Sequence, residues 1–500
     1  MYGTFWALVP PVVAIVLALI TKEVYSSLFV GIVVGALFVA GFNPVGALDT
    51  MVNDGFIASM ADGWNAGIFM FLVLLGIMVA LVNNAGGSAA FGKWAAKHVH
   101  TRGGASLATF ALGAMLFVDD YFNCLTTGSV MRTVTDSQRM SREKLAYHID
   151  ATAAPICMIA PISSWAAAVS ATAQDLDTGV TGIQLFIQAI PYNFYSLMTI
   201  VFIITLSLMN FDYGPMAAAQ LRAYQTGELG NLSPVEEPKE SKASLWDMLI
   251  PVIVLIASCI CGMMYVGGFF DGAGIIDAFA NTDASVGLPW GAIIALLFSA
   301  AYLMLRRVIS FKEVSECIVK GFNAMVPALL ILTFALTLKN MTGALGADVF
   351  VAGLVEGSAE SPFSMLPAII FLVAIGLAFS TGTSWGTFGI LIPIVLPVFK
   401  NNPDLLMIGI SACLAGAVCG DHCSPISDTT IMASAGANVN HIAHVTTQLP
   451  YAMTVAAISF VLYIVAGFVR NAVICLVLGA VVTVATLFVI RKITLKKENA

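Results

Sequence analysis

Charged residues are scarce in this sequence. Asp, Glu, Lys and Arg together make up 10% of its 500 residues, whereas 59% of the residues are hydrophobic and the mean hydropathy is +0.91. A soluble globular protein carries about 25% charged residues. The deficit excludes an ordinary water-soluble protein, and we expect the lipid bilayer, and no nucleic acid, as the partner of this chain.

Long polar stretches are also lacking, so no soluble domain of ordinary size is left over. Apolar runs long enough to cross about 30 Å of hydrocarbon recur along the whole chain. We predict transmembrane spans at residues 5–20, 26–42, 64–82, 104–118, 147–171, 183–209, 246–266, 288–305, 321–338, 364–380, 404–434, 447–468 and 472–490. The first run has no basic residue before it and no small-residue cleavage site after it, which favours a transmembrane helix over a signal peptide.

The sequence suggests no disulfide framework for the nine cysteines. Most of them lie inside apolar segments, where cysteine behaves as a small apolar residue. The string Cys419-Gly-Asp-His-Cys423 superficially resembles a metal site, but it has no second ligand pair at a standard spacing. We therefore expect no transition metal and no resident cofactor.

Two shorter stretches, residues 119–136 and 383–399, are too polar to face lipid and follow a span with no polar loop between. We interpret each as the second arm of a re-entrant hairpin, which is tolerated where protein or a cavity surrounds it. With the N-terminus outside, the hairpins place the 22 Lys and Arg residues in cytoplasmic loops, except Arg132, Lys339, Lys400 and Arg470. This distribution obeys the positive-inside rule and leaves the C-terminus in the cytoplasm.

The chain repeats itself in outline. Gly63-Trp-Asn-Ala66 opens one long apolar span and Gly321-Phe-Asn-Ala324 opens another, and each span is followed by a hairpin and then by a span broken at proline. The charge distribution places Trp64 outside and Phe322 inside, so the two halves have opposite orientation. We predict a first membrane repeat (1–209), a cytoplasmic linker (210–245), a second, inverted repeat (246–468), and an extra terminal helix with a cytoplasmic tail (469–500). Inverted repeats with broken helices are typical of secondary transporters.

Ionisable groups inside the membrane are costly and need a function. In the first half these are Asp119, Asp120 and Asp150, and in the second half they are Asp421, His422 and Asp428. The seven-residue spacing of Asp421 and Asp428 puts them on nearly one face of a helix, although Pro425 lies between them. We predict that these six residues bind the transported ion or proton.

Hydroxyl and amide side chains crowd around these acids. Sodium prefers oxygen ligands, and Pro155 and Pro425 leave helical carbonyls unpaired upstream. The predicted lining residues are Asn123, Thr126, Thr127, Thr152, Thr381, Thr383, Ser384, Thr387, Ser424, Ser427 and Thr429.

Less specific interpretations remain open at this point. In one of them, Asp119 or Asp120 lies at the cytoplasmic or extracellular mouth and is solvated. In another, Asp150 is a cap at the membrane interface, near the basic residues 142–144. His422 is alternatively a packed, neutral histidine that bonds a carbonyl, and the run from Thr381 to Thr387 is a packing seam of small residues.

Residues 376–451 resemble a known family. Ser384-Trp-Gly-Thr-Phe-Gly, Gly420-Asp-His-Cys-Ser-Pro-Ile-Ser-Asp-Thr-Thr430 and His441-Ile-Ala-His-Val-Thr-Thr-Gln-Leu-Pro-Tyr451 look like the NhaC family of sodium/proton antiporters. The resemblance implies an all-α polytopic membrane protein with an elevator-type mechanism, in which the hairpins and broken helices of residues 119–136, 147–171, 381–399 and 411–434 move. It also implies a homodimer. Several antiporters of this family carry a lysine where this chain has His422, which puts simple sodium/proton exchange in doubt.

The leading functional hypothesis is Na⁺/H⁺ antiport in the inner (plasma) membrane, with Asp421 binding Na⁺ or H⁺ in turn. The alternative is Na⁺- or H⁺-coupled transport of a small organic solute, such as a carboxylate (malate or lactate) or an amino acid. An intramembrane aspartyl protease would need a Gly-x-Gly-Asp string, which is absent before Asp421, so we expect no enzyme. A passive channel fits inverted halves and intramembrane acids less well than alternating access does.

Overall fold

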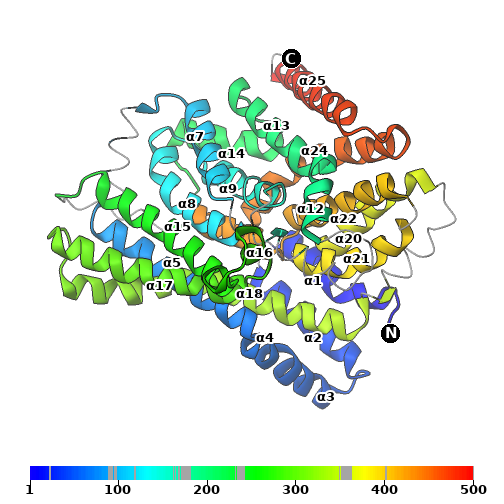
Figure 1. Ribbon diagram of the computed structural model, residues 1–500, viewed down its shortest axis with the longest axis horizontal. Coiled ribbons are helices and arrows are strands. Elements are labelled where there is room, and N and C mark those ends of the chain that lie inside the picture. Colours follow the sequence, from blue (N-terminus) through cyan, green and yellow to red (C-terminus); the bar gives the residue numbers. More distant parts are fainter. Residues whose placement is uncertain are drawn as a thin grey trace.

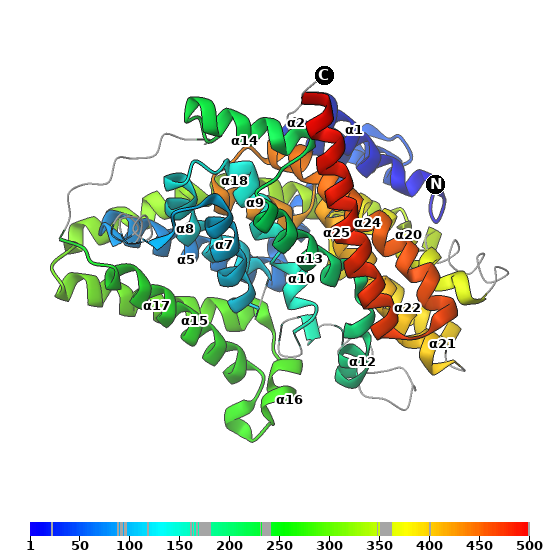
Figure 2. The same cartoon turned by 90° about the horizontal axis from the view of Figure 1, so that it is seen from above.

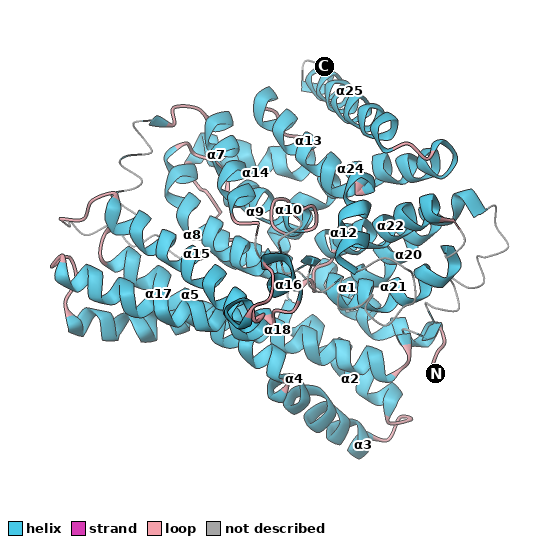
Figure 3. Ribbon diagram, viewed as in Figure 1, coloured by secondary structure: helices cyan, strands magenta, loops and turns pink. Residues whose placement is uncertain are grey.

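A computed structural model describes residues 1–21, 24–87, 90, 94, 98–117, 120–160, 163, 165–166, 169, 182–230, 232, 242–347, 349–350, 363–399 and 402–498. These residues form helices joined by loops, with no strand among them (Figure 3). The predicted site residue Asp119 lies outside the described residues. So do five basic residues used in the topology prediction, namely Lys22, Lys93, Lys97, Lys239 and Lys400.

The first half begins with a pair of packed helices and ends with a broken segment and a long helix. Its elements are η1 (Phe5–Leu8), α1 (Val9–Thr21), α2 (Val24–Val39), α3 (Pro44–Asp49), the π-helical η2 (Thr50–Ile57), α4 (Ala58–Ala61), α5 (Gly63–Asn84), α7 (Arg102–Met115), α8 (Asp120–Ser137), α9 (Arg142–Asp150), α10 (Ala154–Cys157), α12 (Gly182–Ala189), η3 (Ile190–Tyr192) and α13 (Phe194–Met209).

The second half follows a short helix, α14 (Gly214–Thr226), which lies within the predicted linker. Its elements are α15 (Trp246–Val266), η4 (Phe269–Asp271), α16 (Ile275–Ala280), α17 (Ala284–Leu305), α18 (Phe311–Ala344), η6 (Phe363–Met365), α20 (Leu366–Thr381), α21 (Ser384–Phe399), α22 (Pro403–Cys423), α23 (Asp428–Ala437) and α24 (His441–Val469). The last helix, α25 (Ala472–Glu498), has no counterpart in the first half. The order of helix pair, long helix, second helix pair, broken segment and long helix thus occurs twice.

Eight segments in the described part of the chain are long and apolar enough to cross a membrane. They are Gly63–Asn84, Phe194–Thr226, Trp246–Val266, Ser285–Leu305, Phe363–Thr381, Pro403–Cys423, His441–Val469 and Ala472–Thr494. This confirms an all-α polytopic membrane protein. The helix that contains the predicted span 321–338 is longer than the span, because α18 runs from Phe311 to Ala344. Ser310 and Glu313 start it with reciprocal hydrogen bonds, a polar capping box that an apolar-run criterion misses.

The helices form two regions that Figures 1 and 2 separate. In one, α5, α15, α17 and α18 lie side by side; in the other, α20, α21 and α22 pack together and α24 packs against α20 and α22, while α25 lies against α13 and α24. The helices α5 and α18 approach so closely that a Cβ atom on Gly76 would lie 2.5 Å from the carbonyl oxygen of Gly321. The repeated Gly-x-Asn-Ala string opens α5 and lies inside α18, and these two helices are in direct contact.

Three ion pairs fix the start of α9. Arg142 Nη2 lies 2.6 Å from Asp136 Oδ2, Lys144 Nζ lies 2.8 Å from Asp212 Oδ2, and Arg222 Nη2 lies 2.6 Å from Glu143 Oε1. Arg142, Glu143 and Lys144 are all buried, although the sequence suggested an exposed basic loop. These contacts anchor the helix that carries Asp150 at its other end.

Candidate ion and proton site

Two helix breaks lie at the centre of the candidate site. The helix α22 ends at Cys423 and α23 begins at Asp428, while α9 ends at Asp150 and α10 begins at Ala154. Ser427 caps the restarted helix by accepting a hydrogen bond from the backbone N–H of Thr430. The predicted breaks are confirmed, but Asp421 and Asp428 belong to different helices, so their expected shared helical face is wrong.

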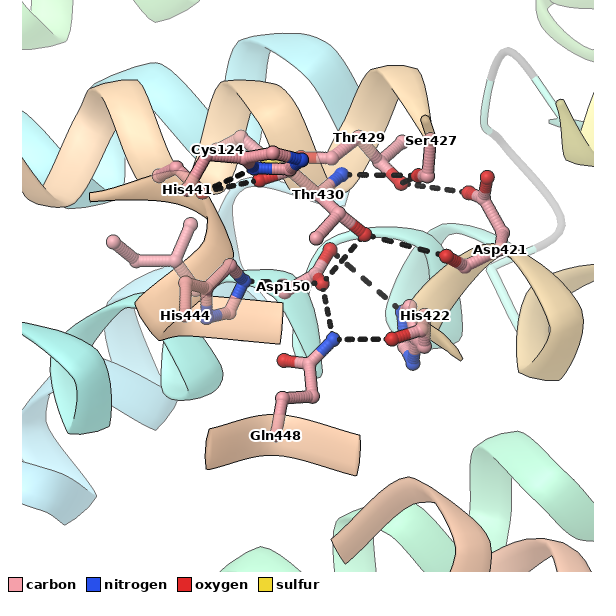
Figure 4. A network of polar contacts seen from close by, with 12 residues as sticks. Cys124, Asp150, Asp421, His422, Ser427, Thr429, Thr430, His441, His444 and Gln448 are labelled. Atoms are coloured by element: carbon pink, nitrogen blue, oxygen red, sulfur yellow. Dashed lines mark hydrogen bonds and ion pairs between the residues drawn. The ribbon is translucent and has the colours of Figure 1, made fainter. Parts of the chain in front are cut away.

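Asp421 is completely buried among hydroxyl groups. Its Oδ2 atom accepts hydrogen bonds from Ser384 Oγ at 2.7 Å and from Thr429 Oγ1 at 2.6 Å. Ser427 Oγ lies 3.1 Å from Thr429 Oγ1, which extends the group of oxygens (Figure 4). The other carboxylate oxygen, Oδ1, has no hydrogen-bond partner. An unpaired carboxylate oxygen beside three hydroxyl oxygens is a set of ligands that suits a hard cation.

The turn between α20 and α21 packs against the break in α22. The backbone N–H of Asp428 donates to the carbonyl of Gly382, and Ser424 Oγ donates to the carbonyl of Phe379 at 2.8 Å. Gly382 has a φ of 68°, and a Cβ atom there would lie 2.3 Å from the carbonyl oxygen of Ile426. Glycine is therefore required for this contact, and Ser384, two residues later, is thereby brought to Asp421.

Asp428 and Asp120 each accept a hydrogen bond from an aromatic side chain of the first half of the chain. Tyr121 Oη donates to Asp428 Oδ2 at 2.6 Å, and Trp165 Nε1 donates to Asp120 Oδ2 at 3.0 Å. Asp428 also borders a small cleft of about 220 Å³, lined by Trp64, Asn65, Ile68, Phe69, Tyr121, Leu336, Asp428 and Met432. Asp120 is completely buried, so its interpretation as a solvated mouth residue is wrong.

Asp150 is completely buried among nitrogen-bearing side chains. Its Oδ2 atom accepts from Gln448 Nε2 at 2.6 Å and from Thr430 Oγ1 at 3.1 Å, and His444 Nε2 lies 3.5 Å away. His422 Nε2 lies 3.9 Å from Asp150 Oδ1 (Figure 4). The interpretation of Asp150 as an interfacial cap is therefore wrong.

In the described part of the chain, the buried acids at the helix breaks have no Lys or Arg partner, and the basic groups near Asp150 are the imidazoles of His422 and His444. Among the described residues, no Lys or Arg forms an ion pair with Asp150, Asp421 or Asp428. A carboxylate without a partner charge is expensive in a membrane interior. Nor does the described part of the chain contain three or more His, Cys, Asp or Glu residues arranged to hold a metal. These acids suit a cargo of Na⁺ or H⁺, which would neutralise them.

Comparisons with known proteins agree with this chemistry. The family model described as the Na⁺/H⁺ antiporter family matches residues 156–468. The chain belongs to the Na⁺/H⁺ antiporter family. It is therefore a secondary transporter, and the family resemblance drawn from residues 376–451 is confirmed.

Individual relatives of this antiporter-family chain differ in how much of it they match. An uncharacterized protein of Haemophilus influenzae is 37% identical over 504 residues, covering 98% of this chain and 96% of the relative. The malate-2H⁺/Na⁺-lactate antiporter of Bacillus subtilis is 31% identical over 182 residues, covering 35% of this chain and 37% of the relative. The YdaH transporter of Alcanivorax borkumensis aligns with 86% of this chain and 90% of its own, at 15% identity and a TM-score of 0.40.

Several predicted lining residues of this antiporter-family protein form hydrogen bonds within or between helices instead. Asn123 Nδ2 donates to the carbonyls of Gly113 and Thr152, which ties α8 to α7 and to the break after α9. The hydroxyls of Thr127, Thr152, Thr381 and Thr387 donate to Asn123 Oδ1, His148 O, Leu377 O and Thr383 O, respectively, and Thr383 Oγ1 accepts from the N–H of Gly386. Of the predicted lining set, Ser384, Ser427 and Thr429 are the hydroxyls grouped with Asp421.

Thr126 lies elsewhere. Its Oγ1 has no partner, and it borders a mostly apolar cavity between α5, α8 and α15. The predicted role of Thr126 as an ion-lining residue therefore has no support from its position.

Five residues that contact the acids were not predicted, namely Tyr121, Trp165, Thr430, His444 and Gln448. His444 and Gln448 lie four residues apart on α24, so they share a face of that helix. Their spacing within the string 441–451 was available from the sequence, but which buried acid they would meet was not. His441 was not predicted either, and it contacts the break itself: its Nε2 lies 2.7 Å from the carbonyl oxygen of Pro425.

Proposed function

We propose that this protein exchanges Na⁺ for H⁺ across the cell membrane and that Asp421 is the carboxylate on which the two compete. The observation that carries the proposal is the buried Asp421 carboxylate, with two hydroxyls on Oδ2 and no partner on Oδ1. Sodium would bind to Asp421, Ser384 and Thr429, and a proton would neutralise the same carboxylate when sodium leaves. One carboxylate shared by two cations couples their fluxes with no covalent chemistry and no resident cofactor, so we assign no enzymatic activity.

Transport into liposomes tests this function. Purified protein is reconstituted with a pH-sensitive dye inside, and Na⁺ or a pH gradient is imposed separately. We expect Na⁺ alone to evoke proton movement in the opposite direction, and Asp421→Asn to abolish it. Asp247→Asn is the matched control, because Asp247 is equally buried but pairs with Arg306 at 3.0 Å, away from the breaks. Exchange by Asp421→Asn at the native rate would remove Asp421 from the mechanism.

A second candidate is sodium-coupled transport of a small organic solute. The local similarity to a relative named as a malate-2H⁺/Na⁺-lactate antiporter favours it. The same liposomes separate the two functions: a Na⁺-evoked pH change in the absence of any organic acid or amino acid favours simple exchange. A pH change that requires malate, lactate or an amino acid favours the second candidate.

We also propose the arrangement in which exchange occurs. The repeated order of elements supports two inverted repeats, 1–209 and 246–468, joined by the linker 210–245 and followed by 469–500. The pairs α7–α8 and α20–α21 would be the re-entrant hairpins, and together with the broken segments they would move past the rest of the protein as an elevator. We place the protein in the inner (plasma) membrane with its C-terminus in the cytoplasm, as a homodimer.

A further inference from the structure

His441 contacts the break between α22 and α23 and the helix that follows it. It is the first residue of α24, and its side chain is 7% exposed. Its Nε2 atom lies 2.7 Å from the carbonyl oxygen of Pro425, inside the break, and its Nδ1 atom lies 2.9 Å from Ser434 Oγ, on α23 (Figure 4). The proposed exchange gives this buried imidazole no role.

The acceptors around the ring determine where it is protonated. A carbonyl oxygen only accepts hydrogen bonds, so Nε2 carries a proton and donates it to Pro425 in either charge state of the ring. Ser434 Oγ also donates to the carbonyl of Thr430 at 2.8 Å, and a hydroxyl has one proton to donate. In a neutral ring, the bond at Nδ1 therefore competes with a bond inside α23. The short bond from Nε2 to Pro425 is the interaction that defines the position of the ring.

Pro425 lies where the backbone most needs a donor. Carbonyl groups in a helix break are without the N–H groups that a continuous helix would supply. The α20–α21 turn holds the end of the break, because the N–H of Asp428 donates to the carbonyl of Gly382. His441 supplies the donor for Pro425 from a third element, α24. The break is thus held from two sides immediately before Thr429, a proposed sodium ligand.

We propose that His441 is a positioning residue for the sodium site: its Nε2–H holds the Pro425 carbonyl and so fixes the break in the shape that presents Thr429 to Asp421. This inference rests on the proposed sodium site and deepens it. Thr429 Oγ1 lies 2.6 Å from Asp421 Oδ2. Thr429 follows Pro425 by four residues, so a rotation of the Pro425 peptide group displaces this hydroxyl. The imidazole therefore acts on sodium affinity through the backbone of the break.

Sodium binding to the purified protein in detergent tests the proposal. Titration calorimetry with NaCl at a fixed alkaline pH gives the Kd for Na⁺, and choline chloride is the control for ionic strength. The shorter amide of His441→Asn does not reach Pro425, and we expect its Kd to rise about tenfold, as the loss of one hydrogen bond allows. His441→Gln has an amide nitrogen at about the distance of Nε2, so its Kd should stay within about threefold of the native value.

Ser434→Ala is the matched control. It removes the hydrogen bond at Nδ1 of the same ring and leaves the bond from Nε2 to Pro425. Its Kd for Na⁺ should stay within about twofold of the native value. Nitrogen NMR of histidine-labelled native protein provides a measurement that needs no change at the site, with His441→Gln identifying the signals of His441. We expect a protonated Nε2.

Four results would overturn the proposal: native Na⁺ affinity in His441→Asn, an equal loss of affinity in His441→Gln, an equal loss in Ser434→Ala, or a native His441 ring whose only proton is on Nδ1. The NMR measurement decides if His441→Asn does not fold. Native protein that binds Na⁺ without moving protons would overturn the proposed exchange and leave this role of His441 intact. Native protein that binds no Na⁺ would overturn both.

Discussion

At the scale of single residues, the two buried acids at the breaks are distinguished by their neighbours. Asp421 accepts hydrogen bonds from Ser384 and Thr429, and Asp150 accepts them from Gln448 and Thr430. Adjacent residues of one helix, Thr429 and Thr430, thus serve different acids. Because α23 restarts at Asp428, its first turn presents successive hydroxyls in different directions.

Ser384→Ala should weaken sodium binding without abolishing exchange. The change removes one oxygen ligand of the proposed sodium ion and one hydrogen bond to Asp421, an interaction of about 1.5–3 kcal/mol for a charged acceptor. We expect the apparent affinity for Na⁺ to fall about tenfold, since about 1.4 kcal/mol is a factor of ten. The measurement is the Na⁺ concentration that gives half-maximal proton movement in liposomes. Ser411→Ala is the control, because Ser411 is buried against Tyr463; an equal effect of both variants would contradict the assignment.

The sequence allowed the acids to be predicted but not their partners. Asp421, Asp428 and Asp150 stand out because charge inside an apolar segment is costly. Ser384 is 37 residues from Asp421, and Thr430 is 280 residues from Asp150. Such contacts depend on how the helices pack, which neither composition nor periodicity specifies. Several predicted hydroxyls, such as Thr381 and Thr387, bond carbonyls of their own helix instead.

At the scale of elements, the contact between the α20–α21 turn and the break in α22 determines the shape of the proposed sodium site. Gly382 makes this contact with a positive φ and with no room for a Cβ atom. The apolar runs predicted the helices on either side, and proline predicted the break. The linker helix α14 and the early start of α18 were not predicted, since α14 begins at Gly214 with a proline in its first turn and α18 begins at a polar cap, and hydrophobicity marks neither start.

Gly382→Ala should impair transport more than Gly376→Ala, the same change a few residues earlier in the chain. An alanine with this φ costs about 1–2 kcal/mol, and its Cβ atom would push the turn away from Ile426. Gly376 has no atom within 4 Å of the Cβ position, so Gly376→Ala should keep the native rate and a similar or slightly higher Tm. We expect at least about a tenfold loss of exchange rate for Gly382→Ala, by the same conversion of energy to a ratio. Rates, and Tm values from thermal unfolding in detergent, compare the pair; equal rates would show that the contact is dispensable.

At the scale of the whole molecule, the two halves share their order of elements, and their corresponding helices α5 and α18 pack against each other. The apolar runs and the repeated Gly-x-Asn-Ala string predicted this order. Opposite orientation in the membrane was inferred from the Lys and Arg residues and stays a prediction.

Labelling from one side of the membrane should distinguish the starts of α5 and α18. Of the nine cysteines, eight are buried and Cys261 is exposed, so the Cys261→Ser variant has no exposed thiol of its own that would react with the label. In it, Met60→Cys precedes α5 and Lys312→Cys lies in the first turn of α18, both at exposed positions. In intact cells, a membrane-impermeant maleimide should label Met60→Cys and spare Lys312→Cys. Labelling of both from the outside would contradict inverted repeats.

The ion pairs at the start of α9 have a consequence for how the protein responds to salt. Dissolved salt weakens attractions between charges that water can reach, but hardly affects charges enclosed by protein. Arg142 with Asp136 and Lys144 with Asp212 are mostly enclosed, with 3% and 4% of the two basic side chains accessible. These ion pairs should therefore be equally stable at high and at low salt concentration, and the geometry around Asp150 should be independent of ionic strength.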